Sequence, residues 1–93
     1  MTFEWQKNEF NLKDDTNAMI ATIGFTMINS NHTYVVERTF VDENHRGLGL
    51  AGKITQEFVE QVKTQNKTIL PLCPFTQKYF EKHPELADLL FKR

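Results

Sequence analysis

Three glycines, an arginine and a lysine gather in one short segment, which reads His45-Arg46-Gly47-Leu48-Gly49-Leu50-Ala51-Gly52-Lys53. The residues before this segment favour strands and those after it favour a helix, so the glycines mark the junction between the two. The first N–H groups of a helix have no partner within it, and the helix dipole adds about half a positive charge there. The segment therefore predicts a seat for a phosphate group.

Cys73 is the second residue whose chemistry stands out, because it is the only cysteine in the chain. It cannot form an internal disulfide, and it lacks the partners of a cysteine-rich metal site. It follows a short apolar run and comes just before a predicted helix. A thiol near a helix N-terminus can have its pKa lowered from about 8.5 and become nucleophilic. The alternative interpretation is a small, buried and unreactive side chain.

Two familiar phosphate-binding patterns fit the glycine segment only in part. The spacing of Gly47, Gly49 and Gly52 matches the dinucleotide fingerprint, but that fold requires an acidic residue about 20 positions later, where Leu72 has apolar or neutral neighbours. Gly47 to Lys53 resembles the start of a nucleoside-triphosphate loop, but Ile54 replaces the hydroxyl that would hold Mg²⁺. The sequence favours a third pattern, Arg46-x-x-Gly49-x-Ala51, between a strand and an amphipathic helix.

Three strands are predicted before the glycines, at about Phe3–Leu12, Ala18–Ile28 and Thr33–Val41. Turn-forming residues separate them, so they are expected to form an antiparallel meander. In the first segment, Phe10 and Leu12 are expected on one side and Phe3 and Trp5 on the other. Gly24 suggests a bulge in the second.

A helix is predicted after the glycines because Leu50, Ile54, Phe58 and Val62 recur every four residues, opposite a charged and amide-rich face. It is expected to end near Gln65 or Asn66. The later elements are expected to be a parallel strand over Thr68–Cys73, a helix from Phe75 or Thr76 to Lys82, and a short apolar C-terminal turn or helix over Leu86–Phe91.

Composition limits the possible partners. The 93 residues suit one domain, 1–93, and 11 basic against 12 acidic residues leave a net charge of -1. With that balance of charges, the chain has no strong overall electrostatic field that would attract nucleic acid or an anionic membrane. No secretory signal and no apolar run of about 20 residues is visible, so a cytoplasmic location is expected. No residues have the spacing of metal ligands, and no metal is expected.

The segment Val41-x-x-x-x-Arg46-Gly47-x-Gly49-Leu50-Ala51 resembles the acyl-coenzyme-A pyrophosphate loop of the GNAT N-acetyltransferase superfamily. Tyr34–Val36, Leu72–Phe75 and Lys82–Glu85 are similar to segments of very small GNAT-like proteins, which are minimal single domains. The resemblance implies an α/β fold (α+β) with a three-strand antiparallel meander, a helix, a parallel strand, a helix and a short C-terminal helix.

The resemblance also implies acetyl-CoA, or coenzyme A, as cosubstrate or ligand. The residues expected to bind it are Val41, Arg46, Gly47, Leu48, Gly49, Leu50, Ala51, Gly52 and Lys53. The pantetheine arm is expected between the strands 33–41 and 68–73, which places the thioester near Thr39–Val41 and Leu72–Cys73. A backbone N–H near Val41 would then stabilise the oxyanion formed when an amine attacks. Glu37, Glu43 and His45 are candidate general bases for that amine.

In this superfamily a tyrosine in the last helix often protonates the leaving thiolate, but Phe80 stands at the matching position here. Tyr79 is the neighbouring candidate for this catalytic role, although it points about 100 degrees away on a helix. Cys73 is the other catalytic candidate, as an acceptor or relay of the acyl group. The function expected is N-acetyl transfer to a small-molecule or peptide amine. The alternatives are a non-catalytic acyl-CoA sensor or carrier, with acyl relay through Cys73, and an interaction domain with a vestigial loop.

Overall fold

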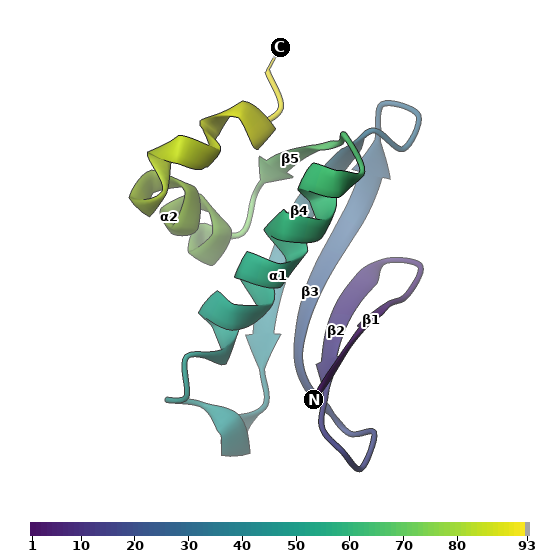
Figure 1. Cartoon of the computed structure of the whole chain (residues 1–93), viewed down its shortest axis with the longest axis vertical. Coiled ribbons are helices and arrows are strands. Elements are labelled where there is room, and N and C mark those ends of the chain that lie inside the picture. Colours follow the sequence, from purple (N-terminus) through teal and green to yellow (C-terminus); the bar gives the residue numbers. More distant parts are fainter. Residues whose placement is uncertain (93) are drawn as a thin grey trace.

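A computed structural model describes residues 1–92; Arg93, the last residue of the expected domain, lies outside the described residues. One sheet has the strand order β1-β2-β3-β4-β5, with β1 Thr2–Trp5, β2 Glu9–Lys13, β3 Met19–Ile28, β4 Thr33–Val41 and β5 Thr68–Pro71. The pairs from β1 to β4 are antiparallel, and β5 is parallel to β4. The helices are α1 Leu50–Thr64 and α2 Pro74–Lys82, with the 3₁₀ segments η1 Glu43–His45 and η2 Pro84–Leu89. Figure 1 shows α1 crossing the sheet, with α2 beside it.

The predicted first strand, Phe3–Leu12, was wrong in one respect: it is a hairpin of β1 and β2. The Gln6 N–H donates to the Glu9 carbonyl across the turn, and the register sets Phe3 opposite Leu12 and Trp5 opposite Phe10. The two pairs predicted on opposite sides therefore share one face. In the hairpin, apolar side chains of both strands pack against α1, and together they bury more apolar surface than one long strand could. This gain in buried surface accounts for the turn.

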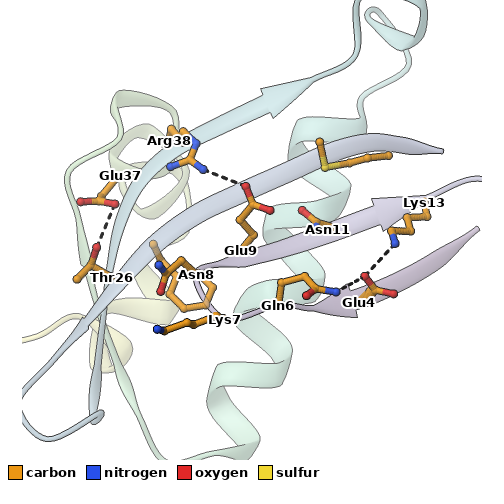
Figure 2. A pocket seen from close by; sticks show the side chains of 12 residues that line it. Glu4, Gln6, Lys7, Asn8, Glu9, Asn11, Lys13, Thr26, Glu37 and Arg38 are labelled. Atoms are coloured by element: carbon orange, nitrogen blue, oxygen red, sulfur yellow. Dashed lines mark hydrogen bonds and ion pairs between the residues drawn. The ribbon is translucent and has the colours of Figure 1, made fainter. Parts of the chain in front are cut away.

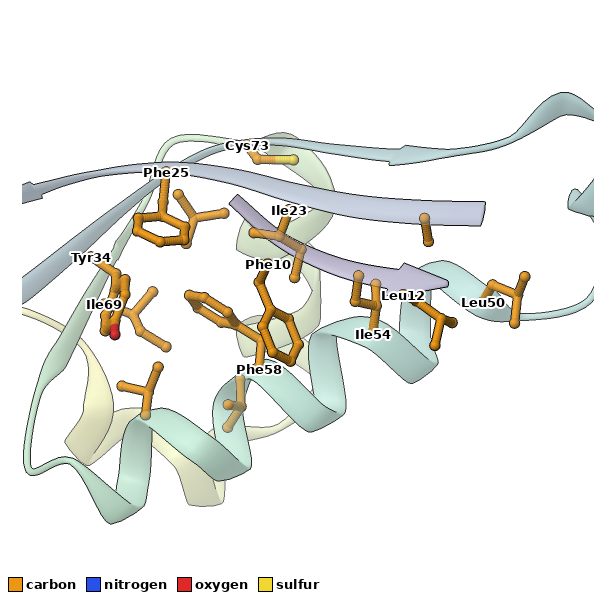
Figure 3. Close-up of a cluster of buried hydrophobic side chains, with 14 of the residues drawn as sticks. Phe10, Leu12, Ile23, Phe25, Tyr34, Leu50, Ile54, Phe58, Ile69 and Cys73 are labelled. Atoms are coloured by element: carbon orange, nitrogen blue, oxygen red, sulfur yellow. The ribbon is translucent and has the colours of Figure 1, made fainter. Parts of the chain in front are cut away.

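An aromatic cluster fills the space between the sheet and α1 (Figure 3). Its rings come from β1, β2, β3, β4 and α1: Trp5, Phe10, Phe25, Tyr34 and Phe58, with centroid separations of 4.5 to 6.1 Å among their contacting pairs. Such rings contribute both buried area and edge-to-face contacts. This cluster fixes α1 on the sheet, and α1 in turn fixes the position of the glycine segment.

The amphipathic pattern of α1 is confirmed, since Leu50, Ile54, Phe58 and Val62 are all buried. The helix ends at Thr64, slightly before the predicted position, and Asn66 follows with a φ of 58°. Asn tolerates that left-handed conformation, which ends helices and here turns the chain into β5. The predicted strand–helix–strand crossover is therefore present.

A bulge interrupts the pairing of β3 and β4. Gly24 lies opposite Arg38 but Phe25 lies opposite Val36, so the additional residue is Glu37 in β4. The bulge occurs next to the glycine that predicted it, on the partner strand. A Cβ at position 24 would overlap the Arg38 guanidinium, which lies across this glycine. The additional residue changes which side chains and backbone groups of β4 face each side.

The C-terminal elements differ in their bounds from the prediction. β5 ends at Pro71 instead of Cys73, because a proline has no N–H to continue the ladder. α2 begins at Pro74, a residue well suited to the first turn of a helix. η2 follows, and Leu90 forms a single parallel bridge with Ile69. Within residues 1–92, no helix has the length and apolar character needed to cross a membrane.

Candidate functional site

The glycine segment forms a loop that leads directly into α1. Gly47 and Gly49 have φ values of 85° and 72°, and Gly49 is the residue that precedes the first turn of α1. Both conformations are left-handed and favour glycine. No side chain caps the helix, and none of the described residues accepts a hydrogen bond from the backbone N–H groups of 47–52. This part of the backbone therefore presents a row of donors that remain available to an anion.

Asp42 braces the start of the loop. Its carboxylate accepts hydrogen bonds from the Asn44 N–H at 3.1 Å and from His45 Nδ1 at 3.0 Å. The His45 hydrogen bond is the main reason that the pKa of Asp42 lies below its ordinary value, despite some desolvation. Arg46 then donates from Nε to the Val41 carbonyl at 3.3 Å. Side chains of the loop thus hold its first residues against the end of β4.

A hollow of about 320 Å³ lies at this junction. It is lined by seven residues of β4, the loop and α1: Val41, His45, Arg46, Gly47, Gly49, Leu50 and Ala51. Six of the nine residues expected to bind a cofactor therefore meet at one place. Leu48 is also in the loop but is 68% exposed and does not line the hollow.

Gly52 and Lys53 are directed elsewhere. Gly52 faces α2, where it lines a hollow of about 310 Å³ with Lys78, Tyr79 and other residues. Lys53 lies in a separate hollow with Phe3 and Glu57. On a helix, consecutive residues point about 100 degrees apart, which explains why neighbours in the motif separate in space. The structure does not bring Lys53 to the glycine hollow.

One edge of β4 is left open beside this hollow. The pairing of β4 with β5 ends at Val36 opposite Pro71, so no described strand lies along the remaining residues of β4 on that side. The Asp42 N–H donates to Ile20 at 2.8 Å, which shows that Asp42 faces β3. Backbone groups alternate along a strand, so those of Val41 and Thr39 face the open side. These N–H groups could hydrogen-bond a ligand that runs along β4.

Cys73 stands where β4 and β5 diverge, apart from the aromatic rings (Figure 3). Its N–H and that of Leu72 both donate to the Val36 carbonyl, and its Sγ lies 3.5 Å from Thr39 Oγ1. Desolvation raises the pKa of this thiol, but the Thr39 hydroxyl and the first turn of α2 outweigh it, so the pKa lies below its ordinary value. The side chain is only 5% exposed. Cys73 therefore combines burial with donors that favour its thiolate.

Tyr79 belongs to α2, and its side chain lies on the side of that helix that faces α1. The centre of its ring lies 4.4 Å from that of His83, with the two rings tilted by 33°, and both residues line a hollow of about 410 Å³ with Gln56 and Glu60. Burial raises the pKa of its phenol, and the charges of Glu60 and Glu85 raise it further. The phenol therefore stays protonated at neutral pH and is a weaker acid than free tyrosine. Phe80, at the position where the superfamily has its tyrosine, is buried in the core.

The general-base candidates do not meet at the glycine hollow. Glu37 accepts a hydrogen bond from Thr26 on the other face of the sheet, where it lines a polar hollow of about 720 Å³ (Figure 2). Glu43 is exposed in η1, and only His45 lines the glycine hollow, bound to Asp42. In the large hollow, the charged side chains form pairs such as Arg38 with Glu9. That face looks like a solvated sheet surface with paired charges.

Sequence reasoning missed Asp42, and it placed Thr39 near the thioester without predicting that the Thr39 side chain contacts Cys73. Asp42 precedes a short polar segment, the place where Asp caps a turn, so its role could have been inferred. The Thr39 contact with Cys73 joins residues that are far apart in the sequence and depends on the bulge in β4. No local signal predicts that contact.

The solved structures with a similar fold are acetyltransferases and related proteins. A GCN5-like protein from Staphylococcus aureus, solved by NMR, matches with a TM-score of 0.73 and 24% identity over 99% of this chain and 89% of its own. A GNAT-family N-acetyltransferase from Escherichia coli, solved in complex with CoA, matches with a TM-score of 0.58 and 20% identity over 69% of this chain and 38% of its own. None of the curated proteins matches the sequence.

The family comparison covers most of the molecule. The family described as GCN5-related N-acetyl-transferase matches residues 9–89. These residues extend from β2 to the end of η2 and include the glycine loop, the open edge of β4 and Cys73. The strand order and the crossover through α1 also agree with those solved structures. This chain is a member of the GCN5-related N-acetyl-transferase family, with a minimal single sheet.

Proposed function

We propose that this protein binds acetyl-CoA at the glycine loop and transfers the acetyl group to an amine. The observation that carries the proposal is the proximity of two sets of backbone donors, one in the glycine loop and the other on the open edge of β4 beside it. The N–H groups of 47–52 have no partner among the described residues, and the open edge of β4 presents those of Thr39 and Val41. Acetyl-CoA has a diphosphate for the first set, and amide and thioester carbonyls for the second.

The proposed reaction needs little from side chains. The diphosphate would rest on the loop, where Gly47 and Gly49 let the backbone approach closely and Arg46 adds charge. The thioester carbonyl would accept a hydrogen bond from the Val41 N–H, which stabilises the oxyanion when a neutral amine attacks; one such donor contributes about 3 kcal/mol in other enzymes. The solved E. coli neighbour with CoA supports the choice of ligand.

A titration with acetyl-CoA, followed through the amide resonances of the protein, tests the binding step. Shifts concentrated in residues 39–53 are expected, and shifts scattered over the sheet would contradict the site. Release of free CoA thiol in the presence of a panel of small-molecule and peptide amines tests turnover. Binding with no amine-dependent release would leave a sensor or carrier of acyl-CoA as the function.

Cys73 supports a second proposal, that the acyl group passes through a covalent intermediate. The Cys73 thiolate would attack the thioester carbon; a bond from that carbon to Sγ forms, the bond to the CoA sulfur breaks, and the CoA thiolate takes a proton from water. The absence of the usual tyrosine, with Phe80 in its place, favours a route that does not depend on that acid.

Intact mass measures this step directly. After incubation with acetyl-CoA, the wild-type protein should gain one acetyl group that is lost on treatment with hydroxylamine. Cys73→Ala should gain none. Equal labelling of the two proteins would place the acetyl group on another residue and rule out the relay.

A further inference from the structure

The hydroxyl of Thr76 is buried and has no hydrogen-bond partner. Thr76 is 2% exposed, and its Oγ1 is the one buried side-chain nitrogen or oxygen without a partner among residues 1–92. Every other buried threonine has its hydroxyl bonded: Thr22 to Asn11, Thr33 to Thr68, and Thr55 to the Ala51 carbonyl. Unsatisfied buried hydroxyls are rare because they lose their bonds to water, so each one requires an explanation.

The place of Thr76 in the chain suggests that explanation. Cys73 precedes the first turn of α2 and Thr76 is the third residue within it, the spacing of a capping box, in which each side chain reaches the backbone N–H of the other residue. No regular capping hydrogen bond forms here. The Thr76 hydroxyl lies outside regular hydrogen-bond geometry but near the Cys73 thiol, and together with the backbone N–H groups of Thr76 and Phe75 it favours the charged form of that thiol.

The groups that shift the pKa of the thiol are hydroxyls and backbone dipoles. From β4 the Thr39 hydroxyl lies 3.5 Å from Sγ, and from α2 come Thr76 and the first-turn amides. No charged side chain is among the groups that shift the pKa of Cys73. The sulfur is therefore near two hydroxyls, one from β4 and one from the first turn of α2.

We propose that Thr76 is a positioning residue that holds the Cys73 sulfur as a thiolate, with Thr39 as its counterpart on β4. The hydroxyl lacks a partner while the thiol is protonated, because a neutral thiol is a weak acceptor. When the proton leaves to water, the anionic sulfur becomes the acceptor for both hydroxyls, and its orientation toward the open edge of β4 is fixed. The importance of this arrangement for acyl transfer rests on the covalent route proposed above.

The single cysteine makes the experiment direct. Protein labelled with carbon-13 at the cysteine Cβ gives one resonance, whose shift follows the thiol as it loses its proton. Thr76→Val removes the hydroxyl and keeps the shape, and should move the midpoint of this titration to higher pH by about half a unit or more, as expected for the loss of one hydrogen bond. Thr76→Ser should restore the wild-type midpoint. Thr55→Val, a buried threonine bonded within α1, should leave it unchanged.

The two proposals fail separately. If Thr76→Val titrates like the wild type, the positioning role is wrong, whatever the acetylation of Cys73. If Thr76→Val shifts the midpoint but acetyl-CoA leaves no acetyl group on Cys73, the positioning role stands and the covalent route is wrong. Should Thr76→Val not fold, Thr76→Ala removes the same hydroxyl, and a titration equal to that of Thr76→Ser would overturn the proposal.

Discussion

The two sides of β4 contrast sharply. Toward β3, the strand is paired from Thr33 to Val41, and its neighbours join an aromatic cluster closed by α1. Toward β5, pairing ends at Val36, and the remaining residues face an opening flanked by the glycine loop and Cys73. Stability is concentrated on one side and available hydrogen-bond donors on the other. This separation means that folding and ligand binding can be disturbed independently.

The aromatic side should give the largest effect. Phe58 is buried at the centre of the cluster, in contact with four other rings, and Phe58→Ala should reduce the free energy of unfolding by about 3–5 kcal/mol. Urea unfolding measures the loss. Under conditions where the variant is folded, its affinity for acetyl-CoA should match that of the wild type. If the variant also loses affinity for acetyl-CoA, folding and ligand binding do not depend on separate sides of β4.

A charge in the glycine loop should affect ligand binding rather than stability. Gly49→Glu places a carboxylate at a left-handed position beside the unpartnered amides, and should weaken acetyl-CoA binding by about 3 kcal/mol, or about a hundredfold. Gly49→Asn tolerates the same backbone without the charge and serves as the control. Isothermal titration separates the two variants. Equal affinities would place the diphosphate elsewhere.

Arg46 should contribute less than the loop backbone. Its Nε is already bonded to the Val41 carbonyl, so Arg46→Gln should cost about 1.5 kcal/mol of binding, or about tenfold in affinity. Lys7→Gln is the matched control, because Lys7 lies on the other face of the sheet. The affinity of the Arg46 variant should also depend less on salt. Identical salt slopes would show that Arg46 does not meet the phosphate.

The smallest effect concerns pH. The pKa of Asp42 is lower in the folded protein than its ordinary value, so its carboxylate stabilises the loop above the ordinary pKa, and this is lost as pH falls through the folded-state value. Asp42→Asn keeps a capping acceptor but loses the charge. Urea unfolding should show a small difference from the wild type at neutral pH that closes in acid. If the difference in the free energy of unfolding persists in acid, it comes from packing and not from the charge of Asp42.

Much of the fold could be predicted because its signals are local. The four-residue spacing of Leu50, Ile54, Phe58 and Val62 defines α1, and turn residues separate β3 from β4. The hairpin of β1 and β2 was missed because Gln6, Lys7 and Asn8 form a turn without glycine or proline. Its register depends on the rings of Trp5 and Phe10 meeting α1, which is a tertiary effect.

The candidate site divides in the same way. The glycines and Arg46 could be found from their spacing, and the structure gathers them with Val41 in one hollow. The direction of Lys53 away from that hollow depends on the rotation of α1, and the approach of Thr39 to Cys73 depends on how β4 and β5 diverge. Neither of these is encoded within a few neighbouring residues.

The bulge at Glu37 determines which side chains of β4 face the open edge. If β4 kept all its residues but alternated regularly from Val36, without the bulge, the guanidinium of Arg38 and the ring of Phe40 would face inward. With the bulge, Arg38 pairs with Glu9 on the outer face and Phe40 is 46% exposed, while the smaller Thr39 contacts Cys73 and Val41 packs against the core. The bulge therefore keeps two large side chains away from the open edge of β4, by a feature of the strand that is independent of the glycine loop.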